Sequence, residues 1–126
     1  MKQLFLLFSH QLTPQQVADA KATLEVERFV YLPQKLQELW SQVPAELEEL
    51  GRYLEPLQTY LSQNLKENDM ILIQGDFGAT CTMVTYLKAK GYQSYYATTS
   101  RKTVEKVVEG KVVKTSVFEH VRFRKY

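Results

Sequence analysis

Cysteine and histidine are scarce in this chain. One cysteine, Cys81, and two histidines, His10 and His120, occur among 126 residues. A single cysteine excludes an internal disulfide framework and suits a reducing compartment. Because these three residues are widely separated, they give no zinc spacing, and Asp76, without an acidic neighbour, gives no magnesium site. We therefore expect no metal and no other cofactor. Cys81 falls in a predicted helix, where a buried small side chain is the commoner role and a nucleophile the alternative.

Long apolar runs are also missing. The apolar run near the amino terminus, Leu4–Phe8, spans five residues. A secretory signal core needs about 7 to 15 apolar residues and a membrane-spanning helix about 20. We therefore expect this run to be a buried β-strand, and the protein to be cytoplasmic with no membrane partner.

The bulk composition is that of one soluble domain. The chain is 44 % hydrophobic and 24 % charged, and it has no repeat or linker, so we expect a single domain over residues 1–126. The net charge of +2 is unevenly divided: residues 1–68 hold six Lys/Arg against nine Asp/Glu, and residues 69–126 hold ten against five. The carboxyl half favours an anionic partner, although a solvated surface explains the surplus equally well.

Short apolar runs predict the strands of a mostly parallel sheet. They alternate with segments of helical spacing, which is typical of α/β folds. We expect a compact Rossmann-like sheet flanked by helices, followed by an antiparallel β-hairpin. The four predicted parallel strands are Leu4–Phe8, Phe29–Leu32, Met70–Ile73 and Ser94–Ala97.

Leucine stripes and capping residues predict the helices. Thr13 followed by Pro14 starts a helix that runs to about Leu24. Apolar residues at helical spacing then predict two further helices, over 36–43 and 47–61. We expect Pro56 to bend or interrupt the second of these, because proline lacks the required donor. A last helix ends near Lys90.

The carboxyl-terminal third has a different, β-rich pattern. Val104–Val108 and Val112–Val117 flank Glu109-Gly110-Lys111, which predicts an antiparallel hairpin. The segment Glu119–Tyr126 either extends the second hairpin strand or forms a separate strand. Its alternation places His120 in a solvent-facing or subunit-facing row with Arg122 and Arg124.

Polar clusters follow three of the predicted strands. Since parallel strands joined by right-handed crossovers align their carboxyl ends at one edge, where ligands of such sheets bind, these clusters should lie together. They are Ser9-His10, the segment Gln74-Gly75-Asp76-Phe77-Gly78-Ala79-Thr80, and the segment Thr98-Thr99-Ser100-Arg101-Lys102.

The middle cluster has the pattern of a phosphate cradle. Gly75 and Gly78 let the backbone turn and approach a ligand, and the following helix offers unpaired amides to an anion. A purely conformational role for both glycines is the alternative. The cluster lacks the Lys-Ser/Thr ending of a P-loop and the third glycine of a dinucleotide fingerprint. Asp76 would orient a hydroxyl or the helix turn rather than contact phosphate.

The other two clusters supply a cation and a titratable group. Arg101, with hydroxyls beside it, can hold a phosphodiester and stabilise charge on its oxygens. Lys102 would point to the face opposite Arg101 if the strand continued, so its alternative role is that of a solvent-exposed surface residue. His10 can exchange protons near neutral pH, with a structural hydrogen bond as its alternative.

With these clusters in place, the chain resembles a family of small CRISPR-associated accessory proteins of type III systems, regarded as ring nucleases. The resemblance covers nearly the whole length. It is carried by Leu4-Phe5-Leu6-Leu7-Phe8-Ser9-His10 with Leu12, Phe29-Val30-Tyr31-Leu32-Pro33, Leu39-Trp40, Ile73-Gln74-Gly75-Asp76-Phe77-Gly78-Ala79-Thr80, Tyr96-Ala97-Thr98-Thr99 with Arg101, and the ending Phe118-Glu119-His120-Val121-Arg122-Phe123-Arg124-Lys125-Tyr126.

The resemblance implies a reduced relative of the CRISPR-associated Rossmann fold that acts as a homodimer. Its ligand would be cyclic tetra-adenylate, the second messenger of type III antiviral defence, and not DNA. Cleavage of the ring would switch off the effectors it activates. A two-fold dimer suits such a ring, since each subunit can engage one half of it.

The implied reaction is metal-independent attack of a ribose 2′-hydroxyl on its neighbouring phosphodiester, giving a linear product with a 2′,3′-cyclic phosphate. We expect Gly75–Ala79 to cradle phosphate and Thr99, Ser100 and Arg101 to bind the scissile group. His10 would transfer a proton or orient the ribose. Two other functions fit the same sequence: a non-catalytic protein that sequesters the messenger, and an RNA-binding or regulatory module that uses the basic hairpin and the face of His120, Arg122 and Arg124.

Overall fold

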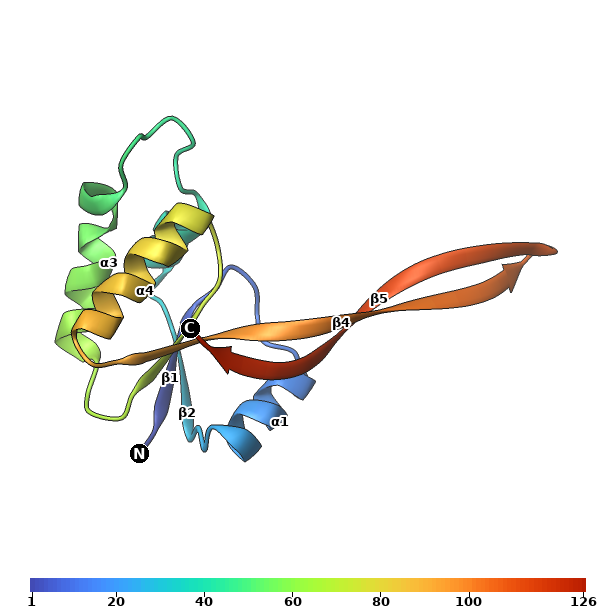
Figure 1. Ribbon diagram of the computed structural model, residues 1–126, viewed down its shortest axis with the longest axis horizontal. Coiled ribbons are helices and arrows are strands. Elements are labelled where there is room, and N and C mark those ends of the chain that lie inside the picture. Colours follow the sequence, from blue (N-terminus) through green and yellow to red (C-terminus); the bar gives the residue numbers. More distant parts are fainter.

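The protein is a mixed α/β structure built on one mostly parallel sheet. The computed structural model describes residues 1–126. Its sheet has five strands in the order β2-β1-β3-β4-β5, of which the first four run parallel and the last runs antiparallel to β4 (Figure 1). The strands are β1 (Gln3–Leu7), β2 (Arg28–Tyr31), β3 (Met70–Ile73), β4 (Gln93–Val108) and β5 (Lys111–Lys125). The expected α/β class and carboxyl-terminal hairpin are thus confirmed.

Helices cover both faces of the sheet (Figure 1). Between strands lie α1 (Pro14–Thr23), α2 (Gln34–Ser41), α3 (Gly51–Asn64) and α4 (Phe77–Ala89). Leu4 and Leu6 of β1 pack with Ala20 of α1 on one face. Phe5 and Leu7 point to the other face, where they pack with residues of α2, α3 and α4. With side chains buried on both faces, Leu4–Leu7 of β1 and all of β3 are apolar, as central strands covered on both sides must be.

Helix α1 begins and ends where its sequence predicts. Thr13 accepts a hydrogen bond from the Gln16 amide, and the Gln16 side chain accepts one from the Thr13 amide, which forms a capping box. Helix α3 differs from expectation. It begins at Gly51 rather than near Leu47, and it passes through Pro56 without interruption. Pro56 is exposed, so its ring does not disturb the packed face of the helix.

The fourth strand is much longer than predicted. The expected break at Thr98–Lys102 is wrong, because β4 continues to Val108 as the partner of β5. A two-residue turn of Glu109 and Gly110, both with positive φ, joins the two strands, and such turns match the twist of a hairpin. Beyond the sheet the pair projects as a free ribbon (Figure 1). We call residues 101–118 the arm.

A β-bulge reverses the expected orientation of His120. Thr98 pairs with Arg122 and Thr99 with His120, so Val121 is the extra residue. His120 therefore faces α1 rather than joining the row of Arg122 and Arg124. Its side chain is 4 % exposed, with Nε2 lying 2.6 Å from Asp19 Oδ2. The prediction of a solvent-facing or subunit-facing His120 is wrong.

The predicted burial of Cys81 is also wrong, because its side chain is exposed. The buried residues of α4 are Ala79, Met83 and Leu87, which recur every four positions. Cys81 lies midway between the first two and so points away from the core. Among the helices of the structure, none has both the length and the apolarity required to cross a membrane.

Candidate functional site

The three predicted polar clusters start at the same edge of the sheet. Leu7 pairs with Ile73 at the end of β1 and β3. The Gln74 amide donates to the Leu7 carbonyl, and the Gln74 side-chain oxygen accepts from the Ala97 amide at 2.7 Å. Gln74 thus joins β1, β3 and β4 at their carboxyl ends. The connection from β1 leads to β2 and the connection from β3 leads to β4, in opposite directions along the sheet, and ligands of open α/β sheets bind at such a point.

His10 lines a cavity on the β2 side of this edge. The cavity has a volume of about 390 Å³ and includes Ser9, His10 and Tyr31 in its wall. The His10 ring packs edge-on against Phe8, with 5.5 Å between ring centroids. The Ser9 hydroxyl lies 3.0 Å from the Ser41 hydroxyl. His10 is exposed and makes no side-chain hydrogen bond, so its imidazole is accessible from solvent.

Both glycines of the middle cluster pack closely against neighbouring side chains. A Cβ on Gly75 would lie 2.9 Å from Nε1 of Trp40, and a Cβ on Gly78 would lie 3.3 Å from Leu50. Neither glycine has a positive φ. Trp40 also donates from Nε1 to the Gln74 carbonyl at 3.1 Å. Packing therefore accounts for Gly75, whereas a Cβ on Gly78 would need only a small shift of the Leu50 side chain. The Trp40 contacts hold the loop in one place against α2.

The middle cluster opens helix α4 at the surface. Asp76 is the N-cap, and its Oδ2 accepts from the Ala79 amide at 3.0 Å. Its carboxylate thus orients the helix turn, one of the two roles expected. The amides of Phe77 and Gly78 lie in the first turn, where no helical acceptor exists. Gly75–Gly78 are exposed, whereas Ala79 is buried and cannot touch a ligand through its side chain.

The hydroxyl of Thr80, the last residue of the middle cluster, is buried and has no hydrogen-bond partner. Its amide donates to the Asp76 carbonyl at 2.8 Å. Thr80 therefore contributes to the start of α4 and lies below the exposed loop.

The last cluster divides between the two faces of the β4–β5 ribbon. Thr99 and Arg101 lie on the α1 side with His120, whereas Thr98, Ser100 and Lys102 lie on the opposite side. Arg101 donates from Nε to the Ser116 hydroxyl at 3.0 Å, and Lys102 pairs with Glu119 at 3.0 Å. Ser100 and Arg101 of one chain therefore cannot face the same phosphate group. The Thr98 hydroxyl is engaged with the Arg122 backbone at the bulge.

Two arginines lie on the α4 side of the ribbon. The sequence did not predict whether they contribute to the site. Arg122 pairs with Thr98 and Arg124 with Tyr96. Arg124 donates to the Tyr96 hydroxyl at 2.8 Å and lies over its ring. The Tyr126 ring packs at a tilt against the Tyr96 ring, and its hydroxyl donates to the Ile73 carbonyl. Burial raises the pKa of Tyr126, so its hydroxyl stays protonated as a donor.

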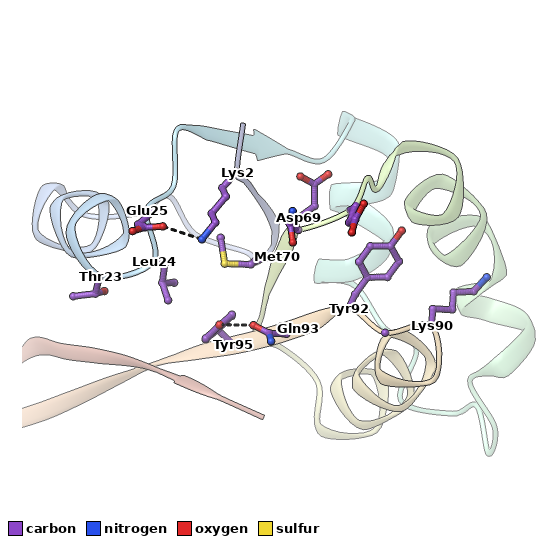
Figure 2. A pocket seen from close by; sticks show the side chains of 13 residues that line it. Lys2, Thr23, Leu24, Glu25, Asp69, Met70, Lys90, Tyr92, Gln93 and Tyr95 are labelled. Atoms are coloured by element: carbon purple, nitrogen blue, oxygen red, sulfur yellow. Dashed lines mark hydrogen bonds and ion pairs between the residues drawn. The ribbon is translucent and has the colours of Figure 1, made fainter.

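A larger cavity lies at the amino edge of the sheet and includes none of the predicted site residues. It has a volume of about 680 Å³, and Lys2, Asp69 and Lys90 are among the residues that line it (Figure 2). It contains one ion pair: Lys2 lies 2.9 Å from Glu25, and a hydrogen bond and the charge of Lys2 hold the pKa of Glu25 below its usual range.

Helix polarity makes that amino edge unfavourable for an anion. Helices α1 and α4 both end there, at Thr23 and Ala89, and helix carboxyl ends carry partial negative charge. The start of α4 lies at the carboxyl edge instead. We therefore take the carboxyl edge as the candidate site. Across residues 1–126 there is no group of three or more His, Cys, Asp or Glu side chains placed to bind a metal ion.

Comparisons with known proteins identify a family that covers nearly the whole chain. A family model described as "Uncharacterized protein MJ1673 family" matches residues 2–124. The chain is 45 % identical over 126 residues to "Uncharacterized protein MJ1673" of Methanocaldococcus jannaschii, an alignment that covers 100 % of this chain and 98 % of that protein. No solved structure matches the chain. By both measures of similarity, the chain belongs to the MJ1673 family.

Proposed function

We propose that the protein is a ring nuclease. It binds cyclic tetra-adenylate at the carboxyl edge of its sheet and cleaves the ring by metal-independent 2′-hydroxyl attack, which switches off type III CRISPR signalling in the cytoplasm. The proposal joins the motif resemblance described above to the arrangement of polar groups at this edge.

The sheet order is consistent with a Rossmann-like, single-domain interpretation. The order β2-β1-β3-β4 is that of doubly wound nucleotide-binding sheets, whose ligands lie beyond β1 and β3. Ser9 and His10 follow β1, and Gly75 follows β3. The motifs that carry the resemblance thus flank the position where this sheet order favours a nucleotide.

The first turn of α4 is the observation that carries the proposal. Its exposed loop presents the unpaired amides of Phe77 and Gly78, and helix amino ends attract phosphate. Arg122 and Arg124 lie on the same side of the sheet as α4. Amides and guanidinium groups together suit a phosphodiester better than a neutral ligand.

The reaction needs only positioning and proton transfer. The 2′-oxygen bonds to the neighbouring phosphorus, the bond from phosphorus to the 5′-oxygen breaks, and the 2′-proton ends on the 5′-oxygen. His10 is accessible and can accept or deliver that proton. Amides at the start of α4 would stabilise charge on the phosphoryl oxygens. Ser100 and Arg101, which face opposite ways in one chain, would engage different phosphates or different halves of a dimer.

The test is single-turnover cleavage in chelator. Cyclic tri-, tetra- and hexa-adenylate are incubated with the purified chain in EDTA, and the products are resolved by chromatography and mass spectrometry. We expect linear product with a 2′,3′-cyclic phosphate from the tetra-adenylate. His10→Ala should slow cleavage by about 10²-fold or more if His10 transfers the proton. Arg101→Ala should also slow it.

The matched control is Lys90→Ala, which removes a cation at the opposite edge of the sheet and should leave cleavage unchanged. Failure of all three rings to bind would refute the proposal. Unaltered turnover in His10→Ala would remove that residue from the mechanism.

Sequestration without cleavage is the second candidate function. It is favoured by the position of His10 in a cavity on the β2 side of the edge, away from the hydroxyls and cations of β4. Recovery of intact, bound ring after long incubation would establish this alternative.

A further inference from the structure

The arm has no partner within the chain. All 18 of its residues, 101–118, are exposed, and six valines and Phe118 are among the large hydrophobic side chains left in solvent. At about 3.4 Å per residue, β4 extends roughly 25 Å beyond Arg101. The arm points away from the helices and the rest of the sheet (Figure 1), so it does not pack on the body of its own chain.

Such a ribbon is incomplete as an isolated structure. A two-stranded hairpin is at best marginally stable in water, and it needs a third strand or another packed layer. The arm also leaves both strand edges unpaired, which soluble proteins normally cover or protect. Apolar side chains on both faces, together with free edges, indicate a surface that packs against protein.

The distribution of charge indicates which protein surface the arm contacts. The arm carries five Lys/Arg against two Glu, whereas the loop 42–50 carries three Glu and no Lys/Arg. Within that loop Leu47 is 42 % exposed, and Phe77 at the start of α4 is 94 % exposed. Gly78 packs against Leu50, so the loop and the start of α4 are in contact. We call residues 42–50 with Phe77 the acceptor surface.

We propose that the arm of one copy docks on the acceptor surface of a second copy, and that the second copy docks its arm on the first. The basic, apolar arm complements the acidic, apolar acceptor surface in both charge and hydrophobicity. Because each copy carries both surfaces, two reciprocal contacts close a symmetric dimer. The acceptor surface lies at the carboxyl edge, so each arm lies beside the start of α4 of the other copy and leaves the amides of its first turn accessible.

The size of this contact fits a stable dimer. Specific interfaces involve about 20–30 residues on each side. Each copy supplies the 18 arm residues, 101–118, together with its acceptor surface. Nucleic acid fits the arm less well, because seven exposed large hydrophobics outnumber five cations. Two of those cations are already paired, Lys102 with Glu119 and Lys114 with Glu105.

Reciprocal charge reversal tests the inference, and it does not depend on the proposed function. One variant carries Lys106→Glu and Lys111→Glu in the arm, and another carries Glu46→Lys and Glu49→Lys in the acceptor surface. Mass is measured by sedimentation equilibrium. Wild type should be a dimer, and each variant alone should dimerise about 10-fold more weakly or worse. An equimolar mixture should restore the dimer, since both contacts are then between opposite charges.

A shortened arm keeps the test independent of charge. Removal of residues 103–108 and 111–116 brings the Lys102–Val117 pair next to the Glu109-Gly110 turn. That pair is six residues from the native Val108–Lys111 pair, so the strand alternation is preserved. The shortened chain should be folded and monomeric by circular dichroism and sedimentation. A dimer that survives shortening and both reversals, or a monomeric wild type that binds single-stranded RNA through the arm, would overturn the inference.

Discussion

Gly75 shows how a single residue positions the candidate site. Its α-carbon lies against the Trp40 indole, whose Nε1 donates to the carbonyl of the preceding residue, Gln74. The indole thus contacts the loop at two successive residues and fixes where α4 begins. Glycine is needed at this position because of close packing, not because of an unusual φ.

Gly75→Ala should therefore destabilise the protein. A Cβ would lie 2.9 Å from Nε1 of the buried Trp40 ring, and overpacking of this kind costs about 1–3 kcal/mol. Gly51→Ala is the matched control, because no atom lies within 4 Å of a Cβ there. In that helical position alanine should be neutral or stabilising by about 0.5–1 kcal/mol. Urea unfolding measures the free energy of unfolding of both variants. Equal changes in Gly75→Ala and Gly51→Ala would mean that the Trp40 contact does not require glycine at position 75.

At the scale of elements, strands buried on both faces were the most predictable. Met70–Ile73 has the predicted bounds, and α1 begins at the predicted Pro14. A continuous apolar run has few alternatives in a chain of this size, and a proline in the first turn with a capping threonine defines a helix start. The polar clusters that follow β1 and β3 could be placed for the same reason.

The bounds and side-chain orientations of the β4–β5 ribbon could not be predicted in the same way. From Thr98 onward no residue of β4 is buried, so no buried face sets the alternation there, and Thr98–Lys102 resembled a loop although it lies inside a strand. The extra residue Val121 then reversed the side on which His120 lies. A one-residue bulge leaves no clear pattern in a sequence, because its effect depends on the partner strand. The opposite orientations of Ser100 and Arg101 were hidden for the same reason.

Helix α3 contains an interior proline, Pro56, that lowers the stability of the helix. Proline at Pro56 leaves the carbonyl of Arg52 without its helical donor, and an interior proline is about 3 kcal/mol less favourable than alanine. Pro56 is exposed, so its removal creates no cavity. The greater freedom of the unfolded chain offsets about 0.4–1 kcal/mol of the gain.

Pro56→Ala should accordingly raise the free energy of unfolding by about 2 kcal/mol. The adjacent Glu55→Ala, also exposed on α3, should change it by less than about 0.5 kcal/mol. Chemical denaturation of both variants provides the comparison. A loss of stability in Pro56→Ala would indicate that the proline ring is required for the local geometry of α3.

For the molecule as a whole, stability and assembly depend on different residues. Two apolar clusters, one on each face of the sheet, contain the buried side chains, and no residue from 101–118 belongs to either. The arm therefore adds nothing to the core of its own chain. If it docks on a second copy, the free energy of that contact adds to the folded state only when the partner is present.

The thermal midpoint should then depend on protein concentration in the wild type and not in the shortened-arm variant. Mass action stabilises a folded dimer as concentration rises, whereas unfolding of a monomer is independent of concentration. Leu57→Ala separates the two effects. Leu57 is fully buried in α3, so its truncation should cost about 2–5 kcal/mol and lower Tm at every concentration, while the concentration dependence persists. Scanning calorimetry over a wide concentration range measures all three chains. Should the shortened variant keep the wild-type dependence, the copies must associate through the body of the domain, and the valines of the arm would need a different partner.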